Sequence, residues 1–459
     1  MTRDTLDITD DKFITVQMND DHCFVPLRRC VYRLDINWSD IFNVTSDIIS
    51  TSSKIATVEE EEPRIAMLAV YTIIYLPFYI AVIGTILWSA LCYIKSLIQT
   101  TEIYPRLHFK ESTLASHLIK KCRLATRSFS PPLWMRNKHI QTFLPFFIPN
   151  CIVEFRREYL QLKDRGVVAL DWVENLHLHR KKRRTVLVII PGLCGTAGGV
   201  SKICQYAAKR GFHPVVFNRR GLGNSFLTTP KLQSYGDPSD LRQVVKYLNG
   251  KYPKALITCV SYGTGSECLL SYLGEFGSSA QISAGVSVSA SFEIAHRTST
   301  KMTGLYDLLF LFLLKKVIWK HARALAKNID IPKALKAWSF KQFDEAVFCK
   351  MYDYTDLDEF WDRNNPLRDV DDISVPLLFI SSEDDPLHSH KNIPFDLFKY
   401  YPHFFLIMSK QGGHCGFIDD ISTLSWADRV VIDYLEAILE FTMKGYTINY
   451  NKSPARSTI

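Results

Sequence analysis

Residues 255–277 read ALITCVSYGTGSECLLSYLGEFG and predict a strand that turns sharply into a helix. Residues 255–260 are a short apolar run, as a buried strand requires. Small residues follow at Ser261, Gly263 and Gly265, so the chain can turn tightly without steric conflict. Residues 264–277 then resume a helical pattern of apolar positions. A strand, a glycine turn and a helix in this order form the repeating unit of a parallel sheet covered by helices.

The same unit recurs on both sides of this turn. Short apolar runs predict strands, and longer periodic stretches between them predict helices. The strands are expected at 186–190, 215–218, 285–289, 376–381 and 404–408, and the helices near 200–210, 238–249 and 424–443. Residues 152–173 contain β-rich stretches that indicate two opening antiparallel strands. We therefore predict an α/β fold, a mostly parallel sheet with helices on both faces.

A charge-free run of residues precedes this domain. Residues 65–94 carry no Asp, Glu, Lys or Arg, and Arg64 and Lys95 flank them. A bilayer core needs about 20 apolar residues, so this run predicts one transmembrane helix. Basic residues dominate on its C-terminal side, which favours a cytosolic main domain. We expect a single-pass protein of the endoplasmic reticulum or another endomembrane.

The composition excludes several classes of protein. The net charge of +8 comes with no nucleic-acid-binding motif, so we expect membrane contact and no nucleic acid as a partner. Eleven cysteines are scattered without CxxC pairs, which argues against a disulfide framework. The pair His388 and His390 has no further ligand nearby, and Gly263-Thr264-Gly265 lacks the third glycine of a dinucleotide motif, since Cys268 stands there. We predict no metal and no cofactor.

Three further segments lie where strands of such a sheet end. Residues 191–195, PGLCG, follow one strand, and Glu383-Asp384-Asp385-Pro386 follow another. Gly412-Gly413-His414 follow the last strand. Ligands of doubly wound sheets bind beyond the carboxyl ends of the strands, where these loops lie. A tight turn, then an acid, then a histidine is the chain order of α/β-hydrolase triads.

At these residues the sequence resembles the membrane-anchored α/β-hydrolase-domain family, which includes acylglycerol lipases, short-chain esterases and phospholipase-like members. The resemblance covers residues from about 132 to 440, and its motifs are WMRNKHIQT (134–142), PGLCG, VFNRRG (216–221), LTTP (227–230), SYLGE (271–275), EDDPL (383–387) and GGHCGF (412–417). It implies that Asp385 is the acid and His414 the base. It also implies oxyanion-hole donors at the Thr264 N–H and in the Leu193–Cys194 region.

The nucleophile position is where this sequence departs from the family. The family motif G-x-S-x-G aligns with Ser261-Tyr262-Gly263-Thr264-Gly265, so Gly263 replaces the catalytic serine. The turn tolerates this change, because the central residue is normally held at positive φ. Ser261, Thr264 and Ser266 are candidates for a displaced nucleophile, although none occupies the centre of the motif.

The resemblance leaves two functions open. One is hydrolysis of a carboxylic ester of a glycerolipid or similar lipid, and the other is a pseudoenzyme that binds a lipid or a partner protein. A helical insertion at about 293–365 would form a lid, and Leu305 to Leu314 within it are almost entirely apolar. This helix would contact acyl chains while Lys315, Lys316 and Lys320 meet headgroups, or it would be an ordinary buried cap helix.

The expected organisation follows from these assignments. We expect an acidic N-terminal segment (1–64), a transmembrane helix (65–94), a basic juxtamembrane linker (95–130), an α/β-hydrolase domain (131–445) and a C-terminal tail (446–459).

Overall fold

The structure, a computed structural model, describes residues 63–98, 102–174, 185–193, 195–293, 304–421 and 424–445. The predicted N-terminal acidic segment (all but its last two residues) and the C-terminal tail lie outside the described residues, as does Cys194. Helix α2 (Pro63–Ile98) contains the predicted membrane span. Its stretch Phe78–Lys95 is long and apolar enough to cross a membrane, and none of this stretch is buried.

The described strands form one nine-stranded sheet in the order β1-β9-β8-β7-β6-β4-β5-β3-β2. The six strands from β9 to β5 in this order run parallel, and the strands at both edges are antiparallel to their neighbours. Their bounds are β1 (Arg106–Phe109), β2 (Phe155–Gln161), β3 (Val167–Val173), β4 (Thr185–Ile190), β5 (Phe212–Asn218), β6 (Leu256–Tyr262), β7 (Ala284–Val288), β8 (Leu377–Ser382) and β9 (Phe404–Ser409). The predicted α/β fold is confirmed.

Helices cover both faces of the sheet and create two apolar cores. One core lies beneath α3 (Thr113–Lys121), α5 (Ser201–Lys209) and α15 (Trp426–Met443). The other lies beneath α6 (Ser239–Lys251), α7 (Gly265–Phe276) and α14 (Leu397–Tyr400). The central strands are apolar on both faces because both faces are buried, and this explains why they appeared in the sequence as continuous apolar runs.

The predicted linker over residues 95–130 is wrong in part. Strand β1 pairs with β9, and α3 packs its buried face, Leu114, Ala115 and Leu118, into one of the two cores. Residues 106–121 therefore belong to the folded domain, which begins well before the predicted boundary at 131. Strand β1 could not be predicted from its residues, because it has only four and is held by pairing with β9.

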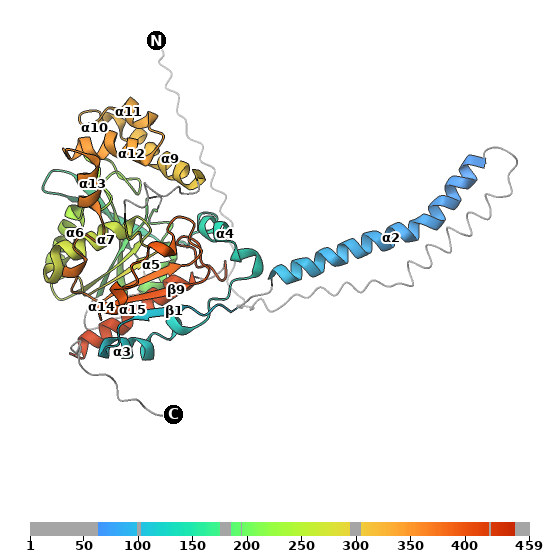
Figure 1. The fold of residues 1–459 in the computed structure, drawn as a ribbon, viewed down its shortest axis with the longest axis horizontal. Coiled ribbons are helices and arrows are strands. Elements are labelled where there is room, and N and C mark those ends of the chain that lie inside the picture. Colours follow the sequence, from blue (N-terminus) through green and yellow to red (C-terminus); the bar gives the residue numbers. More distant parts are fainter. Residues whose placement is uncertain are drawn as a thin grey trace, which may run out of the picture. The chain divides into compact units, whose positions relative to one another are not determined.

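The lid is a group of helices between β7 and β8 with its own apolar cluster. Figure 1 shows these helices gathered at one end of the sheet. They are α9 (Gly304–Lys320), α10 (Ala322–Leu325), α11 (Ile331–Lys336), α12 (Phe340–Asp344), the π-helical turn η5 (Glu345–Cys349) and α13 (Leu357–Asn364).

Helix α9 has one buried face and one exposed apolar face. Leu311, Leu314 and Ile318 are buried against the rest of the lid, whereas Leu308 and Phe312 are more than half exposed. Leu305 and Trp319 are exposed as well. The buried face therefore fits the alternative of a buried cap helix. The exposed apolar face fits the alternative of a helix that contacts lipid.

Candidate active site

Gly263 occupies the turn between β6 and α7. Its φ of +48° lies in the left-handed region that glycine adopts without strain. Its N–H donates to the Val288 carbonyl at 3.0 Å, and its carbonyl accepts from the Ser266 N–H at 2.9 Å. A Cβ at Gly265 would lie 2.5 Å from the Ile190 carbonyl oxygen, so the small residue there allows α7 to begin against the end of β4. The turn therefore has the tight strand-to-helix geometry of a nucleophile elbow.

His414 and Asp385 lie together opposite this turn. The His414 Nδ1 is 3.0 Å from the Asp385 Oδ2, and the Asp385 Oδ1 accepts from the Leu387 and His388 N–H groups at 2.8 and 3.0 Å. The other ring nitrogen, Nε2, lies 2.9 Å from the point where a Cβ on Gly263 would stand. The structure thus brings together the three positions that the family resemblance assigned to a triad.

Burial and charge set the protonation of this pair. Burial alone would raise the pKa of Asp385, but the adjacent His414 ring and the backbone donors hold it below its usual value. Burial alone would lower the pKa of His414, but the Cys415 thiol and the Asp385 carboxylate raise it well above its usual value. The ring is therefore suited to hold a proton received from a neighbouring group.

The segment 134–142 holds the His414 loop in place. The Gln141 amide donates to the carbonyls of Met135 and Ile418 at 2.8 Å each and accepts from the Ile418 N–H at 2.9 Å. The Thr142 hydroxyl accepts from the His414 N–H at 3.0 Å. A Cβ on Gly413 would lie 2.6 Å from the Lys138 carbonyl oxygen, so this loop needs glycine there. The sequence motif at 134–142 thus supports the loop that carries the motif at 412–417.

The three candidates for a displaced nucleophile do not face His414. The Ser261 hydroxyl is fully buried and bonds with the hydroxyls of Ser266 and Ser287 at 3.2 and 3.0 Å and with the Val286 carbonyl. The Thr264 hydroxyl accepts from the Arg219 guanidinium at 3.2 Å. The geometry therefore directs all three hydroxyl groups toward other partners.

The predicted oxyanion hole is described in part. Thr264 precedes the first residue of α7, where backbone N–H groups lack helical acceptors, and Leu193 lies in the loop after β4. A Cβ on Gly192 would lie 3.9 Å from the Thr264 nitrogen, so the two loops are adjacent. Cys194, the other residue assigned to this loop, lies outside the described residues.

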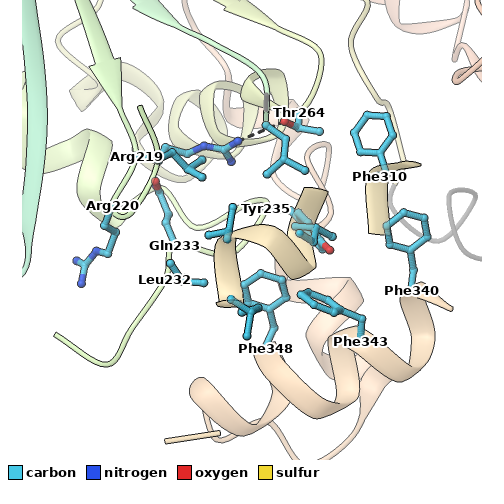
Figure 2. Close-up of a pocket in the computed structure, with 15 residues that line it drawn as sticks. Arg219, Arg220, Leu232, Gln233, Tyr235, Thr264, Phe310, Phe340, Phe343 and Phe348 are labelled. Atoms are coloured by element: carbon cyan, nitrogen blue, oxygen red, sulfur yellow. Dashed lines mark hydrogen bonds between the residues drawn. The ribbon is translucent and has the colours of Figure 1, made fainter. Parts of the chain in front are cut away.

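A narrow apolar pocket extends from these loops into the lid (Figure 2). The empty space within it, counted together with open solvent at its mouth, is about 590 Å³. Leu193 and Thr264 line it on the core side, and Figure 2 shows four lid phenylalanines around it, Phe310, Phe340, Phe343 and Phe348. The buried guanidinium of Arg219 supplies a charged group to this lining. An acyl chain is the kind of ligand that such a lining favours.

Cys415 lies beside the site and was not singled out from the sequence. It follows His414 directly, is partly exposed and has a φ of +58°, which side-chain-bearing residues rarely adopt. Its thiol lies 3.8 Å from the point where a Gly263 Cβ would stand. The signal was present in GGHCGF, but the direction of the side chain depends on a backbone angle that the sequence does not display.

No group of three or more His, Cys, Asp or Glu side chains among the described residues could hold a metal ion. His388 lies beside the site, and its ring stands 5.2 Å from the His414 ring. His390 bonds through Nδ1 to the Glu383 carbonyl at 3.0 Å.

This sheet, with an elbow turn, an acid and a histidine at its carboxyl edge, defines an α/β hydrolase. The sequence pattern of the family described as serine aminopeptidase, S33 (Hydrolase_4) matches residues 181–401. Human protein ABHD15 is 36% identical over 344 residues, which cover 72% of this chain and 74% of that protein. The chain therefore belongs to the AB hydrolase domain family.

Two other relatives carry names that state an activity. Bovine phospholipase ABHD3 is 27% identical over 348 residues, covering 73% of this chain and 85% of that protein. Human monoacylglycerol lipase ABHD2 is 28% identical over 366 residues, covering 73% and 86%. The family thus includes acylglycerol lipase and phospholipase members, and this chain is hydrolase-like.

Proposed function

We propose that this protein is a membrane-anchored lipid-binding member of the family, that its ligand is a lipid carboxylic ester, and that it does not use a serine acyl-enzyme. The observation that carries the proposal is the apolar pocket between the lid phenylalanines and Thr264, the residue next to Gly263. A lipid whose acyl chain fills this pocket would place its ester group near the elbow turn.

Loss of the serine route follows from Gly263. A glycine has no side-chain atom to attack a carbonyl carbon, and the hydroxyls of Ser261, Thr264 and Ser266 are directed elsewhere. In enzymes of this kind, loss of the nucleophile removes most of the rate enhancement, although the oxyanion hole and binding retain roughly 10³-fold catalysis over water. Ligand binding does not require the missing hydroxyl.

Binding is tested with an ether analogue of a monoacylglycerol, which cannot be hydrolysed. Leu314→Trp on α9 fills the pocket, and we expect it to weaken binding of the analogue by about 10-fold or more, since the bulkier side chain takes the place of the acyl chain. Leu308→Trp on the exposed face of the same helix is the matched control and should bind like the natural protein. Equal affinities of both variants and the natural protein would sink the proposed function.

We also propose that α2 anchors the protein in an endomembrane, such as the endoplasmic reticulum, with the main domain in the cytosol. Its long apolar stretch and the basic residues that follow it support this assignment. Deleting residues 65–94 should release the folded domain from membranes upon cell fractionation. If the deletion variant stays tightly bound, the exposed apolar face of α9 is the anchor instead.

A further inference from the structure

The space left by the missing serine side chain has two reactive neighbours. Around the point where a Gly263 Cβ would stand, His414 Nε2 lies at 2.9 Å and Cys415 Sγ at 3.8 Å. The Val288 carbonyl accepts from the Gly263 N–H at 3.0 Å and from the Cys415 thiol at 3.7 Å. The thiol therefore lies beside the elbow turn although it comes from a different loop.

The thiol also has the partners that an attacking group needs. The thiol donates to the Val288 carbonyl, and Cys415 is one of the groups that raise the pKa of the His414 ring. The Nδ1 of this ring is held by Asp385 at 3.0 Å. The Cys415 N–H donates to the Ser289 hydroxyl at 2.9 Å, which fixes the backbone behind the thiol. A sulfur, an imidazole and a carboxylate in this sequence of contacts form the arrangement that activates a cysteine.

Another partly exposed cysteine of the domain, Cys151, provides a contrast. Among the described cysteines outside α2, only Cys151 and Cys415 are not buried. The described interactions of Cys151 comprise a backbone hydrogen bond, in which its N–H donates to the Ser201 hydroxyl at 3.1 Å. Accessibility alone therefore does not distinguish Cys415, whereas contact with the His414–Asp385 pair does.

We propose that Cys415 is the nucleophile of this site and takes up the acyl group of a lipid ester as a thioester. The inference rests on the proposed lipid-ester ligand. It replaces the nucleophile of the β6–α7 turn with one from the loop after β9, while the histidine and the acid keep their positions.

The reaction balances with the groups present. The Cys415 thiol gives its proton to His414 Nε2, and the sulfur attacks the ester carbonyl carbon. The C–S bond forms, the C–O bond to the alcohol breaks, and the alcohol leaves with the proton from His414. Water then attacks the thioester while His414 takes its proton, the C–S bond breaks, and the carboxylic acid and the thiol are restored.

Burial alone lowers the pKa of His414, but Cys415 and Asp385 raise it well above its usual value. The ring can therefore hold the proton that the thiol releases. Cys415 is partly exposed as a residue, and its sulfur lies 3.8 Å from the point where a Gly263 Cβ would stand.

The test uses the full-length protein in detergent micelles with p-nitrophenyl laurate as the acyl donor. Mass spectrometry of the peptide that contains Cys415 should show an added lauroyl group, which hydroxylamine removes. Cys151→Ala, the matched control, should leave this signal unchanged, and Cys415→Ala should abolish it. His414→Gln should slow acylation of Cys415 by about 100-fold or more, because general-base assistance is lost.

Two results distinguish a failure of the cysteine inference from a failure of the proposed function. If the natural protein binds the ether analogue but Cys415 gains no lauroyl group, the cysteine inference is overturned and the proposed function stands. If no lipid binds to the natural protein, the proposed function itself fails. Acylation at an equal rate in His414→Gln would also overturn the inference, because it would reflect the ordinary reactivity of an exposed thiol.

Discussion

The turn after β6 and the loop after β9 each hold one residue in the left-handed region of backbone conformation. The first has a glycine there, and the second has a residue with a side chain. Gly263 has a φ of +48° and no side chain, at the position where the family has its serine. Cys415 has a φ of +58° and carries a thiol, at a position that glycine would occupy without strain. The side chain absent from one turn is present on the other, and both border the same space beside His414.

This comparison teaches that a site can keep its shape while its reactive atom changes origin. The left-handed conformation of a side-chain-bearing residue costs about 1–2 kcal/mol, and the surrounding contacts must offset this cost. At Cys415 these contacts include the bond from its N–H to Ser289 and the support of the adjacent His414 by Thr142. Strain is thus concentrated in the loop that carries both the base and the thiol.

The largest expected effect comes from returning a hydroxyl to the first turn. Gly263→Ser should raise labelling by a fluorophosphonate probe by about 100-fold or more over the natural protein, because the histidine and acid are in place. A new Cβ would lie 2.9 Å from His414 Nε2, so the ring must shift slightly, which the end of a side chain can do. Labelling of the two proteins is compared side by side.

Gly263→Ala is the control for this experiment. It introduces the same Cβ and the same backbone strain without a hydroxyl, and it should remain unlabelled. Strong labelling of the natural protein that is lost in Ser261→Ala or Thr264→Ala would show that a displaced serine or threonine acts instead, and the contrast between the two turns would lose its meaning.

The second-largest expected effect is a loss of stability when Gln141, which supports the loop after β9, is replaced. Gln141→Ala removes three buried hydrogen bonds that connect residues 135 and 418, and it should lower the free energy of unfolding by about 2–3 kcal/mol. Urea denaturation of the protein in detergent measures this change. Gln243→Ala, which loses a contact with the Lys163 N–H at the surface, should cost less than about 1 kcal/mol. Equal losses in both variants would deny Gln141 its supporting role.

A smaller effect should follow from making both turns glycine. Cys415→Gly relieves the strain at φ +58° and should raise the free energy of unfolding by about 0.5–1 kcal/mol while it removes the thiol. Cys151 does not have a positive φ, so Cys151→Gly should give no gain. A clear loss of stability in Cys415→Gly would mean that the thiol contributes more to packing than its backbone conformation costs.

The smallest effect is the pH dependence carried by His414. Its folded pKa is raised above the usual 6.5, so its stabilising contribution is complete below pH 6.5 and is lost as pH rises through the folded value. The melting-temperature difference between the natural protein and His414→Gln should therefore narrow as pH increases above neutrality. A difference that widens instead would mean that the folded ring is neutral and its pKa depressed.

The sequence was sufficient to predict the parallel strands, their helices, the lid and the family, because each depends on a continuous local pattern. It was not sufficient for β1, because the polar–apolar alternation of its four residues, RLHF, is too short to identify a strand, and these residues are held by pairing with β9. The positions of Gly263, Asp385 and His414 followed from motif order. The place of Cys415 did not, because the direction of its side chain results from the packing of residues 138–142 against its loop.

The pairing of β1 with β9 also determines how this protein can be shortened. Arg106–Phe109 cover one edge of the sheet, and the four residues opposite them, 405–408, are apolar. A protein that starts at residue 131 would expose this edge as a row of unpaired amide and carbonyl groups, which is a template for intermolecular β-pairing. Removal of the membrane helix should yield soluble monomers when the chain begins before Arg106, and aggregates when it begins after Phe109.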